Sequence, residues 1–489
     1  MKKIFLTTAI SILSMISLFA QNEMDALRYS MIQNGGTARF TSMGGAFGAL
    51  GGDFSVLSLN PAGLGIYRSS EITITPSIGS QSIESSLFGN TEEDLKYNFN
   101  LNNIGVVFAI PVGNKTDAGG WRFVNLGFGL NRHNNFNSRW AIEGFNTNNS
   151  LMTSFLDQAL REGNVNNFDD FTTGLAWETF LLDMDDEGNL FVDMDDGNVL
   201  QRQTMNTSGY IREFVLSVGA NYNDVLYFGA TVGLPSVSYE QSSIFMESDS
   251  ENSNQFFNSL TYRSNHKTTG TGFNLKVGGM ARLGSVVRLG AAVHTPSFYS
   301  LKDTYRANMR SDLNLDDPDY TEAARYFESP EGLFEYEINT PLKVIGSLGF
   351  VLGTSGLFSL DYEYIDYTNA RLRSDDYMFS HENNMIRNTL TTQHNIRAGG
   401  EIRLDPLVLR AGYAFYSSPF AAGDDGTRNV LSAGFGIRGS SYTLDFAYAY
   451  SMYSEDFALY VVENAAARSP VVQRDYSAST FRLTLGWRF

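Results

Sequence analysis

Segments of alternating apolar and polar residues recur along most of this chain, and they constrain its fold more than any other feature. The last segment places Phe481, Leu483, Leu485, Trp487 and Phe489 on one side, with small or charged residues between them. A period of two predicts a strand with one apolar and one polar face. Five large apolar groups on one strand face need an apolar layer to cover them.

The spacing of these segments predicts a closed sheet. We count fourteen predicted strands: 71–79, 99–112, 121–133, 210–222, 225–240, 268–283, 286–298, 340–353, 356–368, 392–404, 406–417, 428–438, 441–453 and 476–489. Connections after even-numbered strands are tight, whereas those after odd-numbered strands are long, with 134–209, 299–339 and 454–475 the longest. Short turns at one rim and long loops at the other are typical of a transmembrane barrel. An even strand number also lets the first and last strands pair without a free edge.

The N-terminus reads as a secretory signal peptide. Lys2 and Lys3 precede an apolar stretch over 4–19, and Ala20 marks the expected cleavage site, so we assign 1–20 to the signal. No other run of about 18 apolar residues occurs, so no helix is expected to span a bilayer. We therefore expect an all-β protein, a 14-stranded antiparallel transmembrane β-barrel over 71–489 with long extracellular loops. Its expected location is the outer membrane of a Gram-negative bacterium.

Composition narrows the function classes. The 46 Gly, 25 Tyr and 36 Phe suit many strands with tight turns and bulky outer faces. The chain has no Cys, which excludes a disulfide framework. Net charge is −18, or −20 once Lys2 and Lys3 are removed with the signal, and an acidic chain is unsuited to binding nucleic acid. Uninterrupted apolar stripes favour a monomer surrounded by outer-membrane lipid and lipopolysaccharide.

Residues 21–70 do not look like strands. The stretch "GGTARFTSMGGAFGALGGDFSVLSLNPAGLGIYRS" is rich in Gly and contains a turn signal at Asn60-Pro61. A compact segment of this kind ahead of a barrel predicts a small N-terminal plug (hatch) inside it. The alternative is a flexible periplasmic tail, which the mixture of Phe, Leu and Met disfavours.

The segment "MGGAFGALGGDFSVLSLNPAGLG" resembles the N-terminal hatch of the FadL/TodX-like outer-membrane transporters. The resemblance implies that Asn60, Pro61, Ala62 and Gly63 shape the plug. It also implies facilitated uptake of a hydrophobic ligand, namely a fatty acid, an aromatic hydrocarbon or haem, with a lateral exit where the third strand kinks. The terminal aromatic resembles the signal that barrel-assembly machinery recognises. No cofactor is implied.

The third predicted strand, "WRFVNLGFGLNRHNNF", carries the candidate for that exit. If its larger apolar residues face lipid, Asn125, Gly127, Gly129 and Asn131 face the lumen. Glycines weaken a strand or let another backbone approach closely. These four residues are our candidate plug contact, kink or lateral gap. The alternative is that small residues simply make room inside a crowded barrel.

The loop that follows contains a predicted helix, "SLMTSFLDQALREG". Leu151, Phe155, Leu156 and Leu160 form an apolar stripe behind a capping Ser150. By resemblance to loop helices of the related transporters, this stripe is a candidate ligand contact. The alternative is a helix that packs only on neighbouring loops.

A second loop feature is the acidic stretch "DMDDEGNLFVDMDDGN". Asp183, Asp185 and Glu187 before a Gly are similar to the start of a calcium-binding loop, but Met194 stands where the final Glu is needed. We treat this as a weak calcium candidate beside the reading as a solvated acidic hairpin. No other metal site is expected.

Catalysis is not expected. The five His are scattered without metal-like spacing, and no GxSxG motif occurs. The alternative functions are a general porin, or a surface adhesin or haemin-binding outer-membrane protein.

Overall fold

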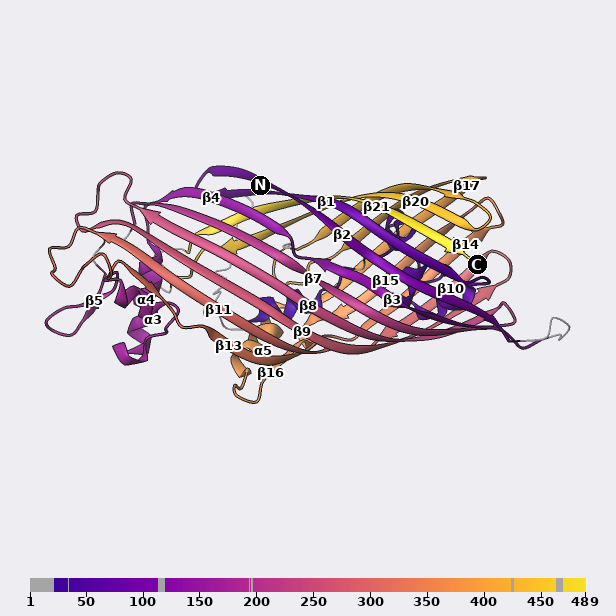
Figure 1. Cartoon of the computed structure of the whole chain (residues 1–489), viewed down its shortest axis with the longest axis horizontal. Coiled ribbons are helices and arrows are strands. Elements are labelled where there is room, and N and C mark those ends of the chain that lie inside the picture. Colours follow the sequence, from indigo (N-terminus) through magenta and orange to yellow (C-terminus); the bar gives the residue numbers. More distant parts are fainter. Residues whose placement is uncertain are drawn as a thin grey trace, which may run out of the picture.

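The structure is a computed structural model that describes residues 22–33, 35–112, 119–192, 194, 197–423, 426–462 and 469–489. The predicted signal peptide 1–20 and most of the predicted turn 113–120 lie outside these residues. Strand segments form one closed barrel with fourteen strand positions (Figure 1). The predicted fold class and strand number are therefore confirmed.

Several positions are built from more than one strand segment. In chain order the segments are β1 (Glu71–Leu87), β2 (Asn90–Pro111), β3 (Trp121–Asn135), β4 (Ser138–Asn146), β7 (Val199–Tyr222), β8 (Leu226–Ser248), β9 (Phe257–Leu283), β10 (Val287–His294), β11 (Phe298–Leu313), β12 (Tyr326–Glu328), β13 (Gly332–Asn339), β14 (Lys343–Leu352), β15 (Gly356–Asp366), β16 (Arg371–Arg373), β17 (Thr392–Leu404), β18 (Leu407–Tyr416), β19 (Arg428–Arg438), β20 (Tyr442–Ala458) and β21 (Val471–Arg488). A small separate hairpin pairs β5 (Asp183–Met184) with β6 (Leu190–Phe191).

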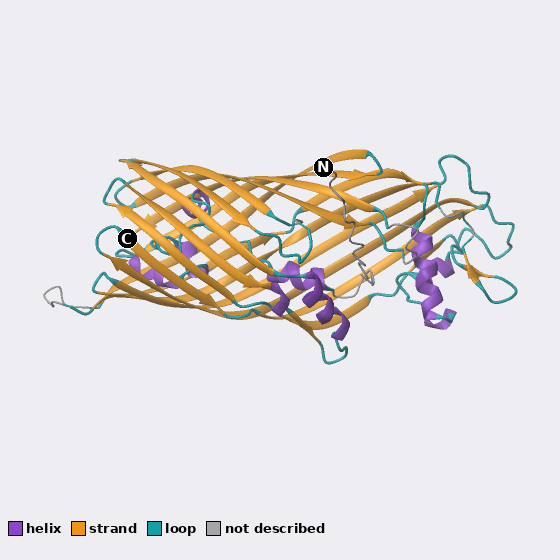
Figure 2. Cartoon of the chain, turned by 180° about the vertical axis from the view of Figure 1, so that it is seen from behind, coloured by secondary structure: helices purple, strands orange, loops and turns teal. Residues whose placement is uncertain are grey.

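The helices lie inside the barrel or on its loops. They are α1 (Glu23–Ser30), α2 (Ala38–Ser42), α3 (Leu151–Glu162), α4 (Thr173–Glu178) and α5 (Ser380–Thr389), with 3₁₀ turns η1 (Phe54–Ser58), η2 (Pro61–Ile66), η3 (Val165–Asn167) and η4 (Tyr367–Asn369). Figure 2 shows the short plug helices inside the strand wall, toward the end where the C-terminus lies. Within the part of the chain that the structure describes, no helix is long and apolar enough to cross a bilayer.

The last strand closes the barrel against the first. The antiparallel register pairs Glu71 with Arg488, and these side chains also form an ion pair at 3.1 Å. The ladder continues to the chain end, where Ser70 and Phe489 exchange two backbone hydrogen bonds of 3.1 and 3.0 Å. Trp487 and Phe489 remain exposed on the outer face, as their alternation predicts.

One rim carries the tight turns. The segments 223–225, 284–286, 353–355, 405–406 and 439–441 each join consecutive strands there, at the same end of the barrel as the C-terminus (Figure 1). The helices α3 and α4 lie at the opposite end. The parity of loop lengths read from the sequence therefore separates the two rims, except that the predicted long connection 80–98 is mostly strand and β1 and β2 are joined by a tight turn at residues 88–89.

The polarity of the long strands β7, β8 and β9 inverts along their length. We call the end with the tight turns the lower end and the end with α3 and α4 the upper end. On the outward face of β7 the residues of the lower half are apolar, including Phe214, Leu216 and Val218, whereas the upper half carries Arg212 and Arg202. The inward face changes in the opposite sense. It carries Glu213, Ser217 and Asn221 at the lower level and Val199, Met205 and Ile211 above. The outer surface of the lower part of the wall is therefore apolar and suits lipid, whereas the outer surface of the upper part is polar and suits water.

We call the apolar outer surface of the lower part the belt, and the upper part the dome. The dome has its own buried core, in which α3 and α4 pack against the inward faces of β7, β9, β11 and β20. Members include Trp140, Phe155, Phe245, Phe257 and Tyr460. A closed barrel with an outward apolar belt is a membrane-spanning architecture of the outer-membrane type.

Three prolines lie where the polarity inverts. Pro235 interrupts the ladder between β8 and β9, while Pro296 and Pro341 stand in the breaks between β10 and β11 and between β13 and β14. Proline has no backbone N–H to give to a ladder, so neighbouring strands bend at a common level. Ser297 and Thr340 bridge the last two breaks, through 2.8 and 3.0 Å hydrogen bonds.

The predicted strand lengths were wrong on the dome side. The predicted loops 134–209 and 299–339 contain β4, the first half of β7, most of β11, and β13. The predicted single strand 286–298 is split between β10 and β11. In the dome the apolar residues face inward and the polar ones outward, so the stripe that marks a lipid-facing strand disappears from the sequence.

Replacing Leu216 with Arg tests where the belt ends. A charge in the middle of the belt is expected to lower the free energy of unfolding by about 2–4 kcal/mol. Thr204→Arg lies on the same face of the same strand in the dome, where water solvates it, and less than about 1 kcal/mol is expected. Denaturant titration in lipid vesicles, followed by tryptophan fluorescence, measures both. Equal losses would contradict the assignment of the belt.

Candidate functional site: the plug and the lumenal cavity

The turn at Asn60-Pro61 organises the plug. The Asn60 Oδ1 accepts the backbone N–H of Ala62 at 3.1 Å and so caps η2, while Pro61 opens that turn without needing a partner for an N–H. The Asn60 Nδ2 donates to the carbonyl of Gly48 at 2.6 Å and to that of Gly279 in β9 at 3.4 Å. One side chain thus ties η2 to the preceding plug segment and to the wall.

Wall glycines leave space for this turn. A Cβ on Gly278 would lie 2.0 Å from the Asn60 Oδ1, and a Cβ on Gly229 would lie 2.2 Å from the carbonyl oxygen of Pro61. A Cβ on Gly219 would similarly come within 2.7 Å of Leu64. We call these three glycines the glycine seat. Only residues without a side chain let the plug backbone approach β7, β8 and β9 this closely.

The four residues predicted to face the lumen from the third strand all lie against the plug. Asn125 donates to the carbonyls of Leu64 and Tyr67 at 2.7 and 3.0 Å, and Asn131 donates to the Ser58 Oγ at 2.9 Å. A Cβ on Gly127 or Gly129 would come within 2.8 Å of Leu57 or Phe54, respectively. The structure therefore brings them together as one plug-facing strip.

The kink lies beyond the two glycines. The ladders of β3 with β2 and with β7 are continuous through Gly127 and Gly129. The ladder with β2 ends at Asn131, which pairs with Asn103, and the register with β7 shifts between Arg132 and Asn134. Of the four predicted residues, only Asn131 therefore stands at the point where β3 leaves β2.

Beyond Asn131 the chain continues as β4, which passes on the lumenal side of β1 and β2. Three consecutive residues of β4, Trp140, Ala141 and Ile142, are all buried, so both faces of β4 are covered. Gly144 lies against the inward-facing Leu87 of β1. The side chain of Asp94 in β2 accepts the Ala141 N–H at 2.7 Å, where a ladder bond would otherwise stand. Between Asn90 and Asn102, the described part of β2 therefore pairs with β1 alone.

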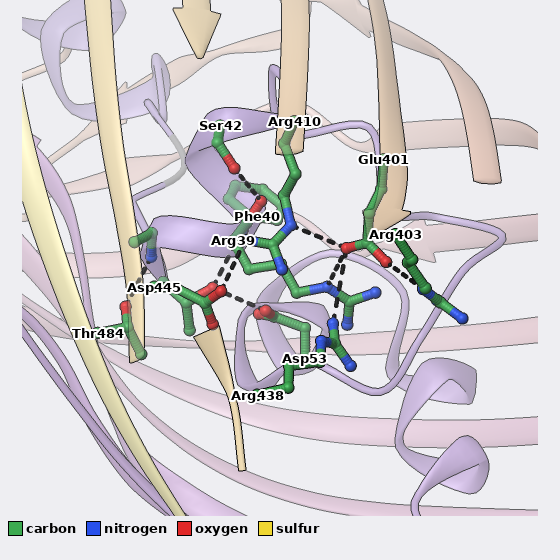
Figure 3. Close-up of polar contacts among 12 residues, drawn as sticks. Arg39, Phe40, Ser42, Asp53, Glu401, Arg403, Arg410, Arg438, Asp445 and Thr484 are labelled. Atoms are coloured by element: carbon green, nitrogen blue, oxygen red, sulfur yellow. Dashed lines mark hydrogen bonds and ion pairs between the residues drawn. The ribbon is translucent and has the colours of Figure 1, made fainter. Parts of the chain in front are cut away.

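An ion-pair cluster fastens the plug helix α2 to the barrel wall (Figure 3). The Glu401 carboxylate of β17 accepts the Arg39 Nε of α2 at 3.0 Å and the Arg410 Nε of β18 at 2.8 Å. Arg403 reaches the other oxygen of the same carboxylate at 2.8 Å, and Arg438 lies 3.6 Å away. Because Glu401 is buried, these guanidinium groups replace the water that its charge has lost.

Further polar contacts hold the plug elsewhere. The Asp361 carboxylate accepts the N–H groups of Phe47 and Gly48, each at 3.0 Å. The Gly44 N–H donates to the Ser432 Oγ at 3.0 Å, and the Ala38 N–H donates to the Thr484 Oγ1 at 2.7 Å. The plug therefore presents backbone donors to wall side chains on several strands, which is how an irregular segment satisfies its buried backbone.

A small cavity with charged groups in its wall lies above the plug. Its walls include Ser58, His133, Glu213, Lys276, His294 and Lys343, together with Ser30 and Ile32 of the N-terminal segment. The space for water-sized molecules is only about 40 Å³, enough for a few waters but not for an acyl chain. Any larger ligand therefore needs the N-terminal segment or the plug to move.

Charged groups line this cavity in opposed pairs. The Glu213 carboxylate binds the Lys276 ammonium and also the His133 Nε2 at 3.1 Å. Lys343 lies 3.6 Å from Glu363, which also pairs with Arg397 at 3.2 Å. Three buried polar atoms of the lining, the His133 Nδ1, the Ser30 Oγ and the Tyr299 hydroxyl, have no hydrogen-bond partner in the part of the chain that the structure describes.

The N-terminal helix closes the lumen above the cavity. Ala26, Leu27 and Tyr29 of α1 are buried against an apolar cluster from β7, β8, β11, β13 and α5. Arg28 stacks on the ring of Tyr239, 4.4 Å from its centroid. The apolar surface that faces the lumen at this height is thus occupied by the chain's own helix.

The predicted loop helix is α3, and most of its stripe is already buried. Leu151 and Phe155 lie in the dome core, Leu156 packs at its edge, and Leu160 is 59 % exposed. Ser150 caps the helix as predicted, and the buried Glu247 accepts the Leu151 N–H at 2.8 Å. A ligand could meet Leu160 directly, but Leu151 and Phe155 only if the dome core opened.

The described carboxylates of the acidic hairpin do not gather into a metal site. The Asn189 side-chain amide donates to the Asp185 Oδ2 at 2.9 Å, and the N–H groups of Asn189 and Glu187 donate to its Oδ1 at 2.7 and 3.0 Å; these turn contacts lower the pKa of Asp185. Across the described residues, no three His, Asp or Glu side chains form a group suited to holding a metal ion. Asp183, Asp185 and Glu187 therefore stand as an exposed turn.

The buried charges of the lumen were missed from sequence. Glu213, Lys276 and Glu363 occupy inward positions in the middle of otherwise regular strands. The available signal was a charged residue on the polar, inward-facing side of an amphipathic strand. Nothing in the sequence indicated which of these groups would meet.

Replacing Gly278 with Val tests the glycine seat. The added side chain overlaps Asn60, so the plug is expected to loosen and ion conductance in planar bilayers to rise. Gly346→Val is the matched control, because a Cβ on Gly346 meets no atom within 4 Å. Heat-modifiable electrophoretic mobility verifies that both barrels fold. If a folded Gly278→Val barrel conducts no more than the control, the seat does not hold the plug.

No protein-family model matches the sequence, and no curated protein matches it detectably. Solved structures nevertheless share its architecture. A FadL homologue of Pseudomonas aeruginosa superposes with a TM-score of 0.57 at 14% identity, covering 94% of this chain and 100% of that one. The toluene transporters TodX of P. putida and TbuX of Ralstonia pickettii give TM-scores of 0.55 and 0.51, at 11% and 12% identity. Both cover 93% of this chain and 99% of their own. This protein has the plugged-barrel fold of the FadL and TodX transporters.

Proposed function

We propose that the protein carries hydrophobic small molecules, long-chain fatty acids among them, inward across the outer membrane. The observation that carries the proposal is the combination of a filled lumen with a sideways break in the wall. The plug is tied to several strands, yet above Asn103 the described part of β2 pairs only with β1, and its edge toward β4 has no ladder partner. An apolar molecule could leave through such a break into the acyl-chain layer, where burial contributes roughly 25 cal/mol per Å² of apolar surface.

The side chains beside the break suit this route. Tyr97 and Phe99 on the outer face of β2 are 71 and 72% exposed, more than any other tyrosine or phenylalanine in the described chain. They lie where β2 has no ladder partner on its β3 side among the described residues, so no cross-strand side chain packs beside them on that edge. A hydrophobic molecule passing between β2 and β3 would meet these rings before it met lipid.

The lumenal cavity suits the polar end of such a molecule. Lys343 lines the cavity, and its partner Glu363 retains Arg397 when Lys343 is removed. In our proposal α1 moves away from the apolar cluster above, and the cargo chain takes its place. A carboxylate end would then lie between Lys276 and Lys343.

The alternative of a general porin is less consistent with the filled lumen. A porin conducts ions steadily through a water-filled channel, whereas a plugged carrier should be nearly silent in a planar bilayer. Large, steady currents from the unmodified protein would favour the porin. The similar solved structures named as toluene transporters keep aromatic hydrocarbons among the candidate cargoes.

Replacing Gly127 and Gly129 together with Val tests the plug-facing strip. The side chain on Gly127 would press on Leu57, and that on Gly129 on Phe54 and on the backbone of Ile104 in β2, so uptake of labelled oleate by cells that depend on this protein is expected to fall severalfold. Heat-modifiable mobility checks folding, and Gly127→Val alone, whose nearest contacts are Leu57 and Leu64 of the plug, gives the result if the double variant does not fold. Gly346→Val again serves as the control, and normal uptake by the double variant would remove this strip from the route.

Lys343→Gln tests the site for the polar end. The variant is expected to bind a long-chain fatty acid about tenfold more weakly, since it loses one charge-assisted contact. Binding of the alcohol of the same chain length should not change. Titration calorimetry in detergent measures both ligands. An equal loss for acid and alcohol would mean that Lys343 supports the cavity and does not contact a carboxylate.

A further inference from the structure

Two arginines face each other on the outer wall where the belt ends. Arg132 of β3 and Arg212 of β7 are direct partners in the antiparallel register. Arg212 shares its face with Phe214, the next outward residue toward the belt, and Leu130 holds the same place on β3. The pair therefore stands one step above the last apolar residues of both strands.

This pairing is unfavourable unless something neutralises it. Like charges directly opposite on neighbouring strands repel. Neither arginine forms an ion pair with any residue in the described ranges. Other cations on the outer face of this wall have carboxylate partners: Lys267 lies 2.7 Å from Glu240, and Arg306 lies 3.0 Å from Glu331. The guanidinium groups of Arg132 and Arg212 therefore have no carboxylate partner among the described residues.

The two guanidinium groups are held in place by neutral groups. Both lie on the ring of Tyr210, with centroid distances of 5.5 Å for Arg132 and 4.6 Å for Arg212. Arg132 donates to the Gly209 carbonyl at 3.1 Å, and Arg212 donates to the Ser236 Oγ at 3.2 Å. The Arg132 Nε has no partner among the described residues. These contacts orient the charges without neutralising them.

A further cation, Lys96 of β2, reaches the backbone of β7. The Lys96 ammonium donates to the carbonyls of Ser138 and Thr207 at 3.1 and 2.8 Å. Thr207 is three residues from Tyr210 on β7, and Lys96 is three residues from the exposed Phe99 on β2. Lys96 likewise forms no ion pair within the described ranges. Lys96 thus contacts β7 three residues from Tyr210, whereas only Arg132 and Arg212 are direct cross-strand partners.

We propose that Arg132 and Arg212 bind a phosphate group of an outer-leaflet glycolipid, with the chemistry of lipid A. Arginine side chains bind phosphate oxygens in pairs, and a phosphate between the two guanidinium groups would replace repulsion by attraction. The level of the site selects a lipid, because acyl chains attached to that phosphate would run down the belt over Leu130 and Phe214. Tyr210 suits the boundary between acyl chains and headgroups.

Binding of bisphosphorylated lipid A to the detergent-solubilised protein tests this proposal. The double variant Arg132→Gln/Arg212→Gln is expected to bind about tenfold more weakly for each arginine lost. Arg212→Lys keeps the charge and should retain most of the affinity. Lys267→Gln is the matched control, since it removes an outer-face cation that already has a carboxylate partner. Heat-modifiable mobility verifies that every variant is folded.

The choice of lipid separates the possible results. Lipid A stripped of its phosphates should bind the unmodified protein as weakly as intact lipid A binds the double variant. Equal binding of intact and dephosphorylated lipid by the unmodified protein would overturn the proposal. So would inorganic phosphate binding as tightly as lipid A, since the site would then take free anions. An effect of Lys267→Gln as large as that of the double variant would also overturn it.

Discussion

The structure depends on the pairing of its two end strands. Within a bilayer no water is present to satisfy a free N–H or carbonyl group, so a sheet can cross only if its ladder has no edge. The register between β1 and β21, extended by the two bonds between Ser70 and Phe489, removes that edge. Once the ring is closed, every strand has one face for lipid and one for the lumen. The plug, the cavity and the break beside β2 are all defined relative to that ring.

The plug is held by many modest contacts. Each neutral hydrogen bond contributes only about 1 kcal/mol net, and the buried ion pairs largely offset their own loss of hydration. The cluster around Glu401 and the glycine seat therefore specify where the plug sits more than they strengthen the protein. The same reasoning applies to α1, whose apolar residues occupy the lumen through a short helix. Such segments can be displaced without opening the ladder of the barrel.

Strands whose apolar side chains face lipid could be predicted from the sequence, and strands whose apolar side chains face the lumen could not. Phe481, Leu485 and Trp487 alternate with polar residues because lipid demands it, and so the strand number and closure could be predicted. The upper half of β7 could not, because Val199 and Met205 face inward and Arg202 faces water. That pattern is the ordinary one for a protein in solution, and it was interpreted as loop.

The candidate site divides in the same way. Asn60 and Pro61 carry a local turn signal, and the small lumenal residues of β3 were identifiable from alternation alone. Glu213 and Lys276 meet only through the register of β7 with β8 and β9, which a single sequence does not display. The kink at Asn131 depends on β4 passing inside β1, a long-range arrangement without a local signal.

The inversion of polarity along β7, β8 and β9 constrains how these strands can be assembled. A shift of one residue would turn every side chain to the opposite face. Below the prolines, such a slip would put Glu213 and Lys276 into the acyl layer; above them, it would put Met205 and Tyr262 into water. A one-residue shift in register is therefore unfavourable both in the part of the strand within the bilayer and in the part within the dome. A strand of more than twenty residues, which could otherwise settle in several alignments, is left with one.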